Sequence, residues 1–465
     1  MKLSTLLTIL KPLNAKLSKN INPNSIKISE FKIDSRKVNT GDCFIPLKGK
    51  NTDGHNYIKN AFENNAICSL AHINKANKCP EDSLCILIDQ DPYEALLLIA
   101  KYKHKKYIKE KTIAITGSAG KTTTKYMLAH ILKSKFEVYF TPGNLNGDIG
   151  TPLALANLNH TFDFAILEFG TAKFGEINLQ KRIAPPDISV LLKIAHAHTQ
   201  FLKNIKGVIK EKGEILNPTG KNVIAYDLLK HYQSILNKSN TITFGYNPSA
   251  DIVIANVKIT QNGTTGNVNI KPIKKQITLN IPVYHKHIFE NISAIIGTLI
   301  HANVYSDKLI KSIESFVPAQ QRGSIEYYKL NKTLITFANY TYNANDASIT
   351  NAIETIQDIK TNAQKILYIA DILELGNQSQ AVHKQIGKQL KKLNNTTIFL
   401  QGPLMKHAYN ELKNKKHVFY SEDQGSLLKK LNNYIKSQSS VFIWAIGSLG
   451  MKTFNIVQDW KPIKK

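Results

Sequence analysis

The stretch Lys111–Lys125, KTIAITGSAGKTTTK, constrains the fold more than any other part of the chain. The run Thr112–Thr116, with Ile-Ala-Ile at its centre, predicts a buried strand, Gly117–Gly120 predict a tight loop, and a helix is expected to begin at Lys121. Such a turn points backbone N–H groups and the positive end of a helix dipole into one small space, which favours a phosphate anion. A glycine-rich turn without a function is the alternative. The strand, loop, lysine and hydroxyls together predict a site for a nucleoside triphosphate.

Within this site, Lys121 would place a point charge near the outer phosphates, and the hydroxyl of Thr122 or Thr123 could reach Mg²⁺. The usual P-loop pattern G-x-x-x-x-G-K-[ST] is not met, because Ile115 stands at its first glycine. The chain has the shorter pattern T-G-x-x-G-K-T-T instead. The predicted nucleotide-binding residues of the loop are Gly117, Ser118, Gly120, Lys121, Thr122 and Thr123.

The length and charge of the chain limit the classes of protein to which it can belong. Its 465 residues predict two to four domains, and 42% apolar with 20% charged residues is typical of a globular protein. A net charge of +27 raises the question of nucleic-acid binding. However, the lysines are spread along the whole chain, and no basic block interleaved with aromatic residues is found. We therefore expect no nucleic-acid partner, but a field that attracts anionic substrates.

The N-terminal part also indicates the compartment. Leucines near the start fall on one helical face, so an amphipathic helix is expected rather than a signal peptide; they are Leu3, Leu6, Leu7, Leu10 and Leu13. No apolar run approaches the length that spans a bilayer, so no membrane insertion is expected. Four cysteines lack metal-binding spacing and are expected to be free thiols; they are Cys43, Cys68, Cys79 and Cys85. These features predict a cytoplasmic protein.

Alternation of strands and helices predicts an α/β fold with three domains. Residues 1–108 would form a small N-terminal α/β substrate domain, with helices at about 57–64 and 92–102 and a strand at 85–88. Residues 109–316 would form a central P-loop ATPase domain with a mostly parallel sheet, β-rich from 223 to 283 and closed by a helix at 288–301. Residues 317–465 would form a C-terminal Rossmann-like α/β domain, with strands at 334–338, 366–370, 397–400 and 441–446.

Three further groups of polar residues are candidates for binding. Glu168 ends a predicted strand at 164–167, where a carboxylate could hold Mg²⁺, although a capping or surface glutamate is the alternative. His196 and His198 follow a predicted strand at 187–194 and could bind a metal, but such a pair is more often structural. Asp34-Ser35-Arg36 offers a carboxylate, a hydroxyl and an arginine fork suited to a uridine or diphosphate group, or forms an ordinary surface loop.

Several motifs resemble the Mur ligases of peptidoglycan assembly from end to end of the chain. GSAGKTTTK, LEFGTAKFGEI, AHAHTQF and KGEI stand in the family's order and spacing. GNLNGDIGTPL, TYNANDAS and ADILELGNQSQAVH are similar to the members that add D-alanyl-D-alanine to UDP-N-acetylmuramoyl-tripeptide. The resemblance implies that ATP and Mg²⁺ are the cofactors. It also implies that ATP phosphorylates the carboxylate of the tripeptide, and that the amine of the dipeptide attacks the acyl phosphate. The chain is expected to act as a monomer.

The resemblance also assigns roles to individual residues. It implies catalytic roles for Lys121, His198 and Lys212, with Lys212 carbamylated, although a surface lysine in a helix is the alternative. Mg²⁺ would be held by Thr122, Glu168 and His198. ATP would be contacted by Asn291, Arg322 and Asn339 besides the loop. The substrates would be contacted by Asp34, Ser35, Arg36, Asn144, Asn343 and Asn345.

The chain departs from the family pattern at several positions. Asn339 and Tyr340 replace two aspartates, so the contact with the ribose is expected to weaken or to be remade by an amide. Ile446 and Leu449 replace two cations that could pair with the carboxylate of the dipeptide. Smaller departures are Ala119, Gln200 and Ile288. Two alternatives to the D-alanyl-D-alanine reaction therefore stay open: a Mur-type ligase for another acceptor or carboxylate, and a nucleotide-binding regulator without catalysis.

Overall fold

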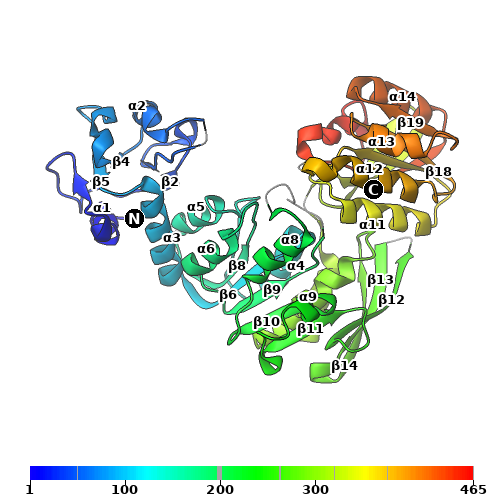
Figure 1. The fold of residues 1–465 in the computed structure, drawn as a ribbon, viewed down its shortest axis with the longest axis horizontal. Helices are drawn as coiled ribbons and strands as arrows, with labels where there is room; N and C mark the ends of the chain where they lie inside the picture. Colours follow the sequence, from blue (N-terminus) through cyan, green and yellow to red (C-terminus); the bar gives the residue numbers. More distant parts are fainter. Residues whose placement is uncertain (50, 196–201, 261–262, 319, 374, 464–465) are drawn as a thin grey trace. The chain divides into compact units, whose positions relative to one another are not determined.

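The computed structural model describes residues 1–465 except 50, 196–201, 261–262, 319, 374 and 464–465 (Figure 1). The chain forms two compact units. The first unit contains Met1–Ala114, Lys135–Thr171 and Gly175–Asp187; the second contains Ile115–Ser134, Ala172–Phe174 and Ile188–Lys465. The domain boundaries predicted from the sequence, near 108 and 316, stay a prediction.

The N-terminal part of the first unit is a five-stranded sheet with the order β1-β5-β4-β3-β2, parallel except for β1. Its strands are β1 (Lys16–Leu17), β2 (Phe31–Lys32), β3 (Cys43–Phe44), β4 (Cys68–His72) and β5 (Cys85–Ile88). Its helices are α1 (Leu3–Ile9), α2 (Ile58–Glu63) and α3 (Pro92–Tyr107). Four of the five N-terminal leucines are buried in its core, which confirms the amphipathic helix. All four cysteines are free, as expected.

The rest of the first unit is a sheet layer with the strand order β6-β8-β7, in which β7 and β8 are parallel. Its elements are β6 (Ile108–Thr116), β7 (Val138–Phe140), α5 (Gly150–Ala156), β8 (Phe162–Glu168) and α6 (Glu176–Ile183). The boundary between the units falls inside β6, after Ala114.

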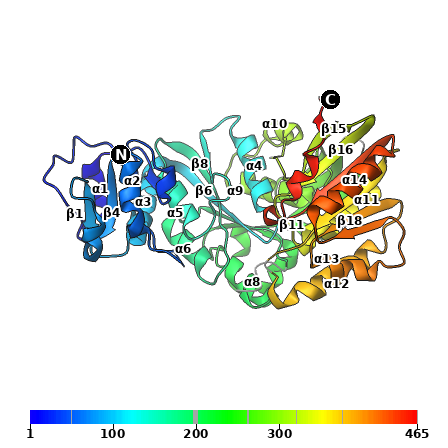
Figure 2. The ribbon, with the colours of Figure 1, turned by 90° about the horizontal axis from the view of Figure 1, so that it is seen from above.

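In the second unit, the sheet continues from the end of β6 in the order β14-β13-β12-β11-β10-β9-β6. Its strands are β9 (Ile188–Leu191), β10 (Lys221–Ala225), β11 (Thr241–Gly245), β12 (Ile252–Thr260), β13 (Gly263–Ile270) and β14 (Lys275–Ile281). Its helices are α4 (Lys121–Leu132), α8 (Ile205–Gly213), α9 (Ile288–His301) and α10 (Asp307–Lys311). β9 to β12 are parallel and β12 to β14 antiparallel, which agrees with the predicted β-rich segment. The nearly all-buried α9 packs beside α4 (Figure 2).

The C-terminal part of the second unit is a seven-stranded sheet with the order β19-β18-β17-β20-β16-β15-β21. Its strands are β15 (Ser324–Leu330), β16 (Thr333–Tyr340), β17 (Gln364–Ala370), β18 (Thr396–Gln401), β19 (Val418–Ser421), β20 (Ser440–Ile446) and β21 (Lys461–Pro462). Its helices are α11 (Asp346–Asp358), α12 (Ser379–Leu390), α13 (Met405–Glu411) and α14 (Gln424–Lys436). Helices α11 to α13 cover one face over one apolar core, and α14 covers the other over a second core (Figure 1).

Most predicted elements are confirmed, but several differ at their ends, among them the following three. The helix predicted at 92–102 continues to Tyr107, because the charged residues that follow are good helix formers and Ile108 then starts β6. The strand predicted at 187–194 ends at Leu191. The helix predicted at 57–64 begins as a 3₁₀ turn at Gly54–Tyr57, where Asp53 accepts a hydrogen bond from the His55 N–H, and becomes α-helical at Ile58.

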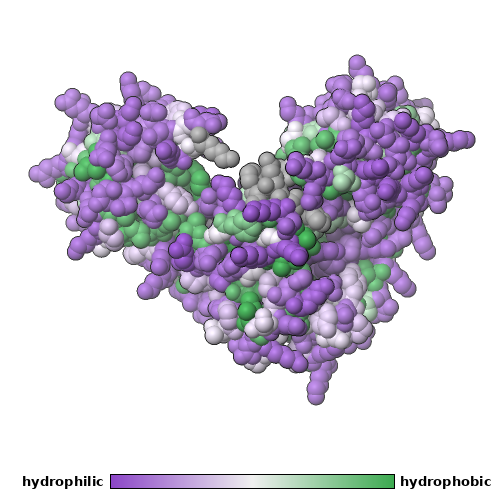
Figure 3. All heavy atoms as spheres, viewed as in Figure 1, coloured by the Kyte–Doolittle hydropathy of each residue, from purple (hydrophilic) through white to green (hydrophobic). Residues whose placement is uncertain are grey.

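No helix among the described residues is long and apolar enough to cross a membrane. The face shown in Figure 3 is mostly hydrophilic, with apolar residues in scattered groups.

Candidate functional site

The loop between β6 and α4 has the shape that the sequence predicts. Gly120 has φ +84°, in the left-handed region that favours glycine, and a Cβ there would lie 2.4 Å from Oδ1 of Asn291. A Cβ at Gly117 would lie 2.8 Å from Cβ of Leu192. Both glycines are therefore required by close approach, and Asn291 of α9 contacts the loop directly. This contact brings together two residues predicted to bind ATP from positions 171 apart in the sequence.

Hydrogen bonds hold the loop in place. The Ser118 N–H donates to the carbonyl of Lys193 (2.8 Å), and Ser118 Oγ donates to the carbonyl of Ala195 (3.0 Å). Lys121 Nζ donates to the carbonyl of Gly117 (2.7 Å), so its ammonium lies over the loop at the first turn of α4. An ammonium and a helix N-terminus that face the same loop suit an anion with several negative oxygens. Thr122 is buried and Thr123 is partly exposed beside them.

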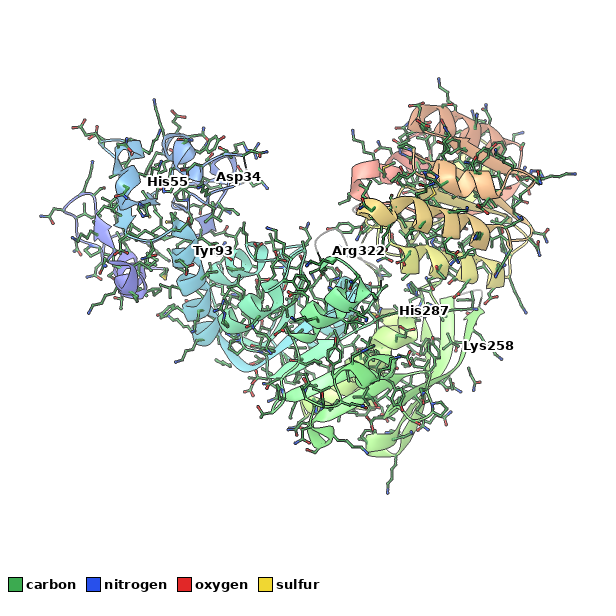
Figure 4. All side chains as sticks on the ribbon, in the orientation of Figure 1. Asp34, His55, Tyr93, Lys258, His287 and Arg322 are labelled. Carbon is green, nitrogen blue, oxygen red and sulfur yellow. The ribbon has the colours of Figure 1, made fainter. Side chains whose placement is uncertain are left out.

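A charged cluster stands at the start of α9. His287 Nδ1 lies 2.7 Å from Glu290 Oε1, and Lys193 Nζ lies 3.9 Å from the same oxygen. Burial raises the pKa of Glu290, but the hydrogen bond from His287 and the charge of Lys193 outweigh it, so the pKa lies below its usual value. Figure 4 labels His287 at this position. The cluster fixes the first turn of α9, which carries Asn291.

Lys212 lies in α8 and is only 1% exposed, next to the equally buried Glu211. The alternative of a surface lysine is therefore wrong. Tyr232 covers the end of the helix, because its hydroxyl donates to the carbonyl of Ile209 (2.6 Å) and its ring fills the space beside Gly213. A buried lysine needs charge partners or a chemical change that removes its positive charge. His198, the third predicted catalytic residue, and His196 lie outside the described residues.

In the first unit, Glu168 ends β8 with 2% exposure. Its Oε1 accepts a hydrogen bond from Asn146 Nδ2 (2.7 Å), and its N–H donates to Thr141 Oγ1 (3.0 Å). The loop that carries the predicted substrate residue Asn144 is thereby attached to the end of β8. A surface glutamate is excluded, and a carboxylate with this support has the chemistry of an Mg²⁺ ligand. Among the described residues, no group of three acidic, His or Cys side chains gathers into a metal site.

The predicted Asp34-Ser35-Arg36 site is partly occupied by its own internal contacts. Asp34 accepts hydrogen bonds from Nε and Nη2 of Arg36, both at 2.9 Å, and these bonds hold its pKa below the usual value. The Arg36 side chain stays 83% exposed, whereas Ser35 is 5% exposed. Asp34, labelled in Figure 4, therefore orients the guanidinium, and Arg36 is the member of the three that can meet an anion.

The predicted residues of the C-terminal part differ in what their side chains contact. Arg322 lies over the ring of Tyr342, 3.6 Å from its centroid. Asn343 is exposed, whereas Asn345 caps α11 by accepting a hydrogen bond from the Ser348 N–H (2.8 Å). Asn343 is thus better placed than Asn345 to contact a substrate.

Asn339 and Ile446 are both buried. Asn339 is 4% exposed; its Nδ2 donates to Glu326 Oε1 (3.0 Å), and its Oδ1 accepts from Thr341 Oγ1 (2.8 Å). Ile446 is 1% exposed within the core under α11 to α13. Of the two positions where cations were expected, only Leu449, 42% exposed, can meet a ligand. The partnership of Glu326 with Asn339 was not predicted from the sequence, because it depends on the pairing of two strands.

Comparisons with known proteins agree with this geometry. Residues 115–299 match the Mur ligase middle domain, and residues 27–96 match the catalytic domain of the Mur ligase family. The chain is 31% identical to UDP-N-acetylmuramoyl-tripeptide–D-alanyl-D-alanine ligase of Bacillus subtilis over 438 residues, 92% of each chain. It is 32% identical to the protein of the same name from Buchnera aphidicola over 446 residues, 94% of this chain and 93% of the relative. The chain belongs to the Mur ligase family.

Solved structures of Mur ligases have the same fold. MurF from Acinetobacter baumannii superposes with a TM-score of 0.84 at 24% identity, covering 98% of each chain. MurF from Thermotoga maritima, solved in complex with ADP, gives a TM-score of 0.79 at 25% identity, covering 94% of this chain and 97% of the other. The three-domain α/β fold with mostly parallel sheets is therefore that of a Mur ligase.

Proposed function

We propose that the protein uses ATP to join D-alanyl-D-alanine to UDP-N-acetylmuramoyl-tripeptide in the synthesis of peptidoglycan precursors. The observation that carries the proposal is the loop of Gly117–Lys121, with Lys121 over the loop and Asn291 against Gly120. This loop stands in a chain that matches enzymes named for that reaction over more than nine tenths of its length.

The reaction needs an activated carboxylate. The terminal carboxylate of the tripeptide attacks the γ-phosphorus of ATP, and ADP leaves, which gives an acyl phosphate. The amine of D-alanyl-D-alanine attacks the acyl carbon, phosphate leaves, and the amine loses a proton. Lys121 and the N-terminus of α4 stabilise the negative charge that develops on the transferred phosphoryl group. Asn291 is proposed to contact the adenine and Arg322 the phosphates.

Magnesium is the second cofactor of the proposal. When bound, Mg²⁺ would neutralise phosphate oxygens, and Thr122, Glu168 and His198 are proposed to hold it. Carbamylation of Lys212 would convert a buried cation into an anion able to orient the acceptor or a metal. Arg36, Asn144 and Asn343 are the proposed substrate contacts that the described structure leaves most accessible. We further propose that the protein acts as a monomer in the cytoplasm.

One observation favours a second candidate for the amine substrate. The exposed Leu449 stands where the family resemblance leads us to expect a cation, and it cannot pair with the carboxylate of a dipeptide. A Mur ligase with a more apolar acceptor is therefore the second candidate.

Measurement of ADP release separates the candidates. The purified protein would be given ATP, Mg²⁺ and UDP-N-acetylmuramoyl-tripeptide, with and without D-alanyl-D-alanine. Release that depends on both substrates, with the pentapeptide nucleotide as product, is the expected result. Release with another amine but not with D-alanyl-D-alanine would favour the second candidate. No turnover with any acceptor would favour a regulator without catalysis.

A further inference from the structure

The side-chain carboxylate of Glu326, in β15, is surrounded by uncharged hydrogen-bond donors. Its Oε1 accepts hydrogen bonds from Ser324 Oγ (2.6 Å) and Asn339 Nδ2 (3.0 Å), and its Oε2 accepts from Tyr328 Oη (2.7 Å). β15 and β16 are antiparallel, with Ser324 opposite Asn339, so the group lies at the end of β16. Because β16 is parallel to β20, this end is the carboxyl edge, where open α/β sheets bind their ligands.

The hydrogen bonds of Asn339 determine what it can offer to a ligand. Its carbonyl oxygen already accepts from the N–H and the hydroxyl of Thr341, which uses both lone pairs. One amide N–H is directed at Glu326, and only the other remains. Asn339 can therefore donate to a ligand but cannot accept from a sugar hydroxyl. A carboxylate is the group that usually accepts from the hydroxyls of a nucleotide's ribose.

Glu326 has the acceptor capacity that Asn339 lacks. A carboxylate offers about four acceptor positions, of which three are used here. Among the described residues, no Lys, Arg or His forms an ion pair with Glu326, although the chain has 61 Lys and Arg against 34 Asp and Glu. The one arginine nearby in sequence, Arg322, lies over the ring of Tyr342. Glu326 is only partly buried, in contrast to the buried Asn339 beside it.

We propose that Glu326 is the residue that accepts a hydroxyl of the nucleotide's sugar, with Asn339 fixed beside it as an amide donor. This inference rests on the proposed function. In this chain the negative charge of the sugar site is that of Glu326 on β15, and the amide is that of Asn339 on β16. Position 339 carries no charge in this chain, and Glu326 supplies the negative charge of the site instead.

An exchange of the two groups tests the proposal. Glu326→Gln removes the charge and should raise the KM for ATP about tenfold, the effect of one charge-assisted hydrogen bond, with kcat changed less than twofold. Asn339→Asp places two carboxylates 3.0 Å apart and should also raise the KM, because like charges repel at that distance. The double variant Glu326→Gln with Asn339→Asp restores one charge and one amide, and should return the KM to within about threefold of the parent.

Sugar analogues distinguish binding from a structural role. The parent should prefer ATP to 2′-deoxy-ATP or to 3′-deoxy-ATP, and Glu326→Gln should lose that preference for the hydroxyl it contacts. Glu422→Gln is the matched control, because Glu422 also accepts from a tyrosine hydroxyl (Tyr420, 3.1 Å) but is exposed after β19; its KM should not change. Thermal melting of each variant checks folding.

Two results would overturn the proposal. One is a Glu326→Gln enzyme with the parent's KM and the parent's preference among sugar analogues. The other is a folded double variant that binds ATP no better than either single variant. Failure of the parent itself to release ADP would instead count against the proposed function.

Discussion

A hydrogen bond of Lys121 to the loop explains both its place and its expected role. Its ammonium donates to the Gly117 carbonyl at the first turn of α4, on a partly exposed surface. We expect Lys121→Ala to reduce kcat by about 10²–10³-fold, the scale of losing one preorganised donor, while the unfolding free energy changes by less than about 0.5 kcal/mol. ADP release and denaturant melts measure the two. Lys133→Ala, at the exposed other end of α4, is the control. Near-parental turnover in Lys121→Ala would remove the lysine from the phosphate site.

Lys212 gives a second prediction, which tests carbamylation. Lys212→Ala should lose about a hundredfold in activity and recover part of it with added acetate or propionate, because a small carboxylate can occupy the place of the carbamate. A ¹³C NMR signal from protein equilibrated with labelled bicarbonate should be present in the parent and absent from the variant. Loss of activity without rescue, together with no difference in the NMR signal, would assign the buried lysine a structural role.

At the scale of residues, the sequence predicted the positions of residues whose neighbours are close in the chain. It did not predict the contacts of residues whose neighbours lie on another strand of the sheet. Gly120 and Lys121 belong to a continuous motif, so their positions followed from it. The burial of Ile446 and the bond from Asn339 to Glu326 arise only when β16 pairs with β20 and β15. The motif positions of 339 and 446 did not show that Ile446 is buried in the core or that Asn339 donates to Glu326.

At the scale of elements, strands were predicted well because each is a short apolar run bounded by turn residues, as in β5, β17 and β20. Element ends were less predictable. The end of α3 is set by the start of β6 rather than by a helix-stop residue, and the short β9 is bounded by the loop that meets Ser118. Both depend on neighbours that the local sequence does not show.

The strand–loop–helix element around Gly120 gives a third prediction. Gly120→Ala combines an unfavourable backbone conformation with a clash against Asn291, whereas Gly175→Ala has a similar φ (+89°) and open space around its Cβ. Both should lose about 1–2 kcal/mol of unfolding free energy from the conformation. Only Gly120→Ala should also lose ATP binding, measured by calorimetry, because the loop must move away from Asn291. Equal ATP binding by the two variants would show that the loop tolerates the added methyl group.

At the scale of the whole molecule, the fold class could be predicted because alternating strands and helices allow few arrangements, and the motifs fixed their order. The dependence of the protein's stability on pH could not be predicted in the same way, because it depends on which titratable groups are buried.

Each compact unit contains a histidine that folding keeps neutral. Burial lowers the pKa of His104, in the first unit, to about 4, against a partial opposing effect of Asp187. Burial and then the charge of His287 lower the pKa of His285, in the second unit, to about 3.

These two histidines predict that acid destabilises the protein. Below about pH 6.5 the unfolded chain binds a proton at each histidine, whereas the folded protein does not until about pH 4 and pH 3. The stability is therefore complete above pH 6.5 and falls as the pH drops toward those values, by about 1 kcal/mol per pH unit for each histidine. Denaturant melts from pH 7 to pH 5 should show this slope, and His104→Gln and His285→Gln should each remove one histidine's part of it, because glutamine takes up no proton. A remainder should stay, because burial also lowers the pKa of His301 and of His383. His160→Asn, at an exposed position, should leave the slope unchanged. A parent whose stability is flat between pH 7 and pH 5 would mean that both rings take up protons in the folded state, and hence that water reaches them.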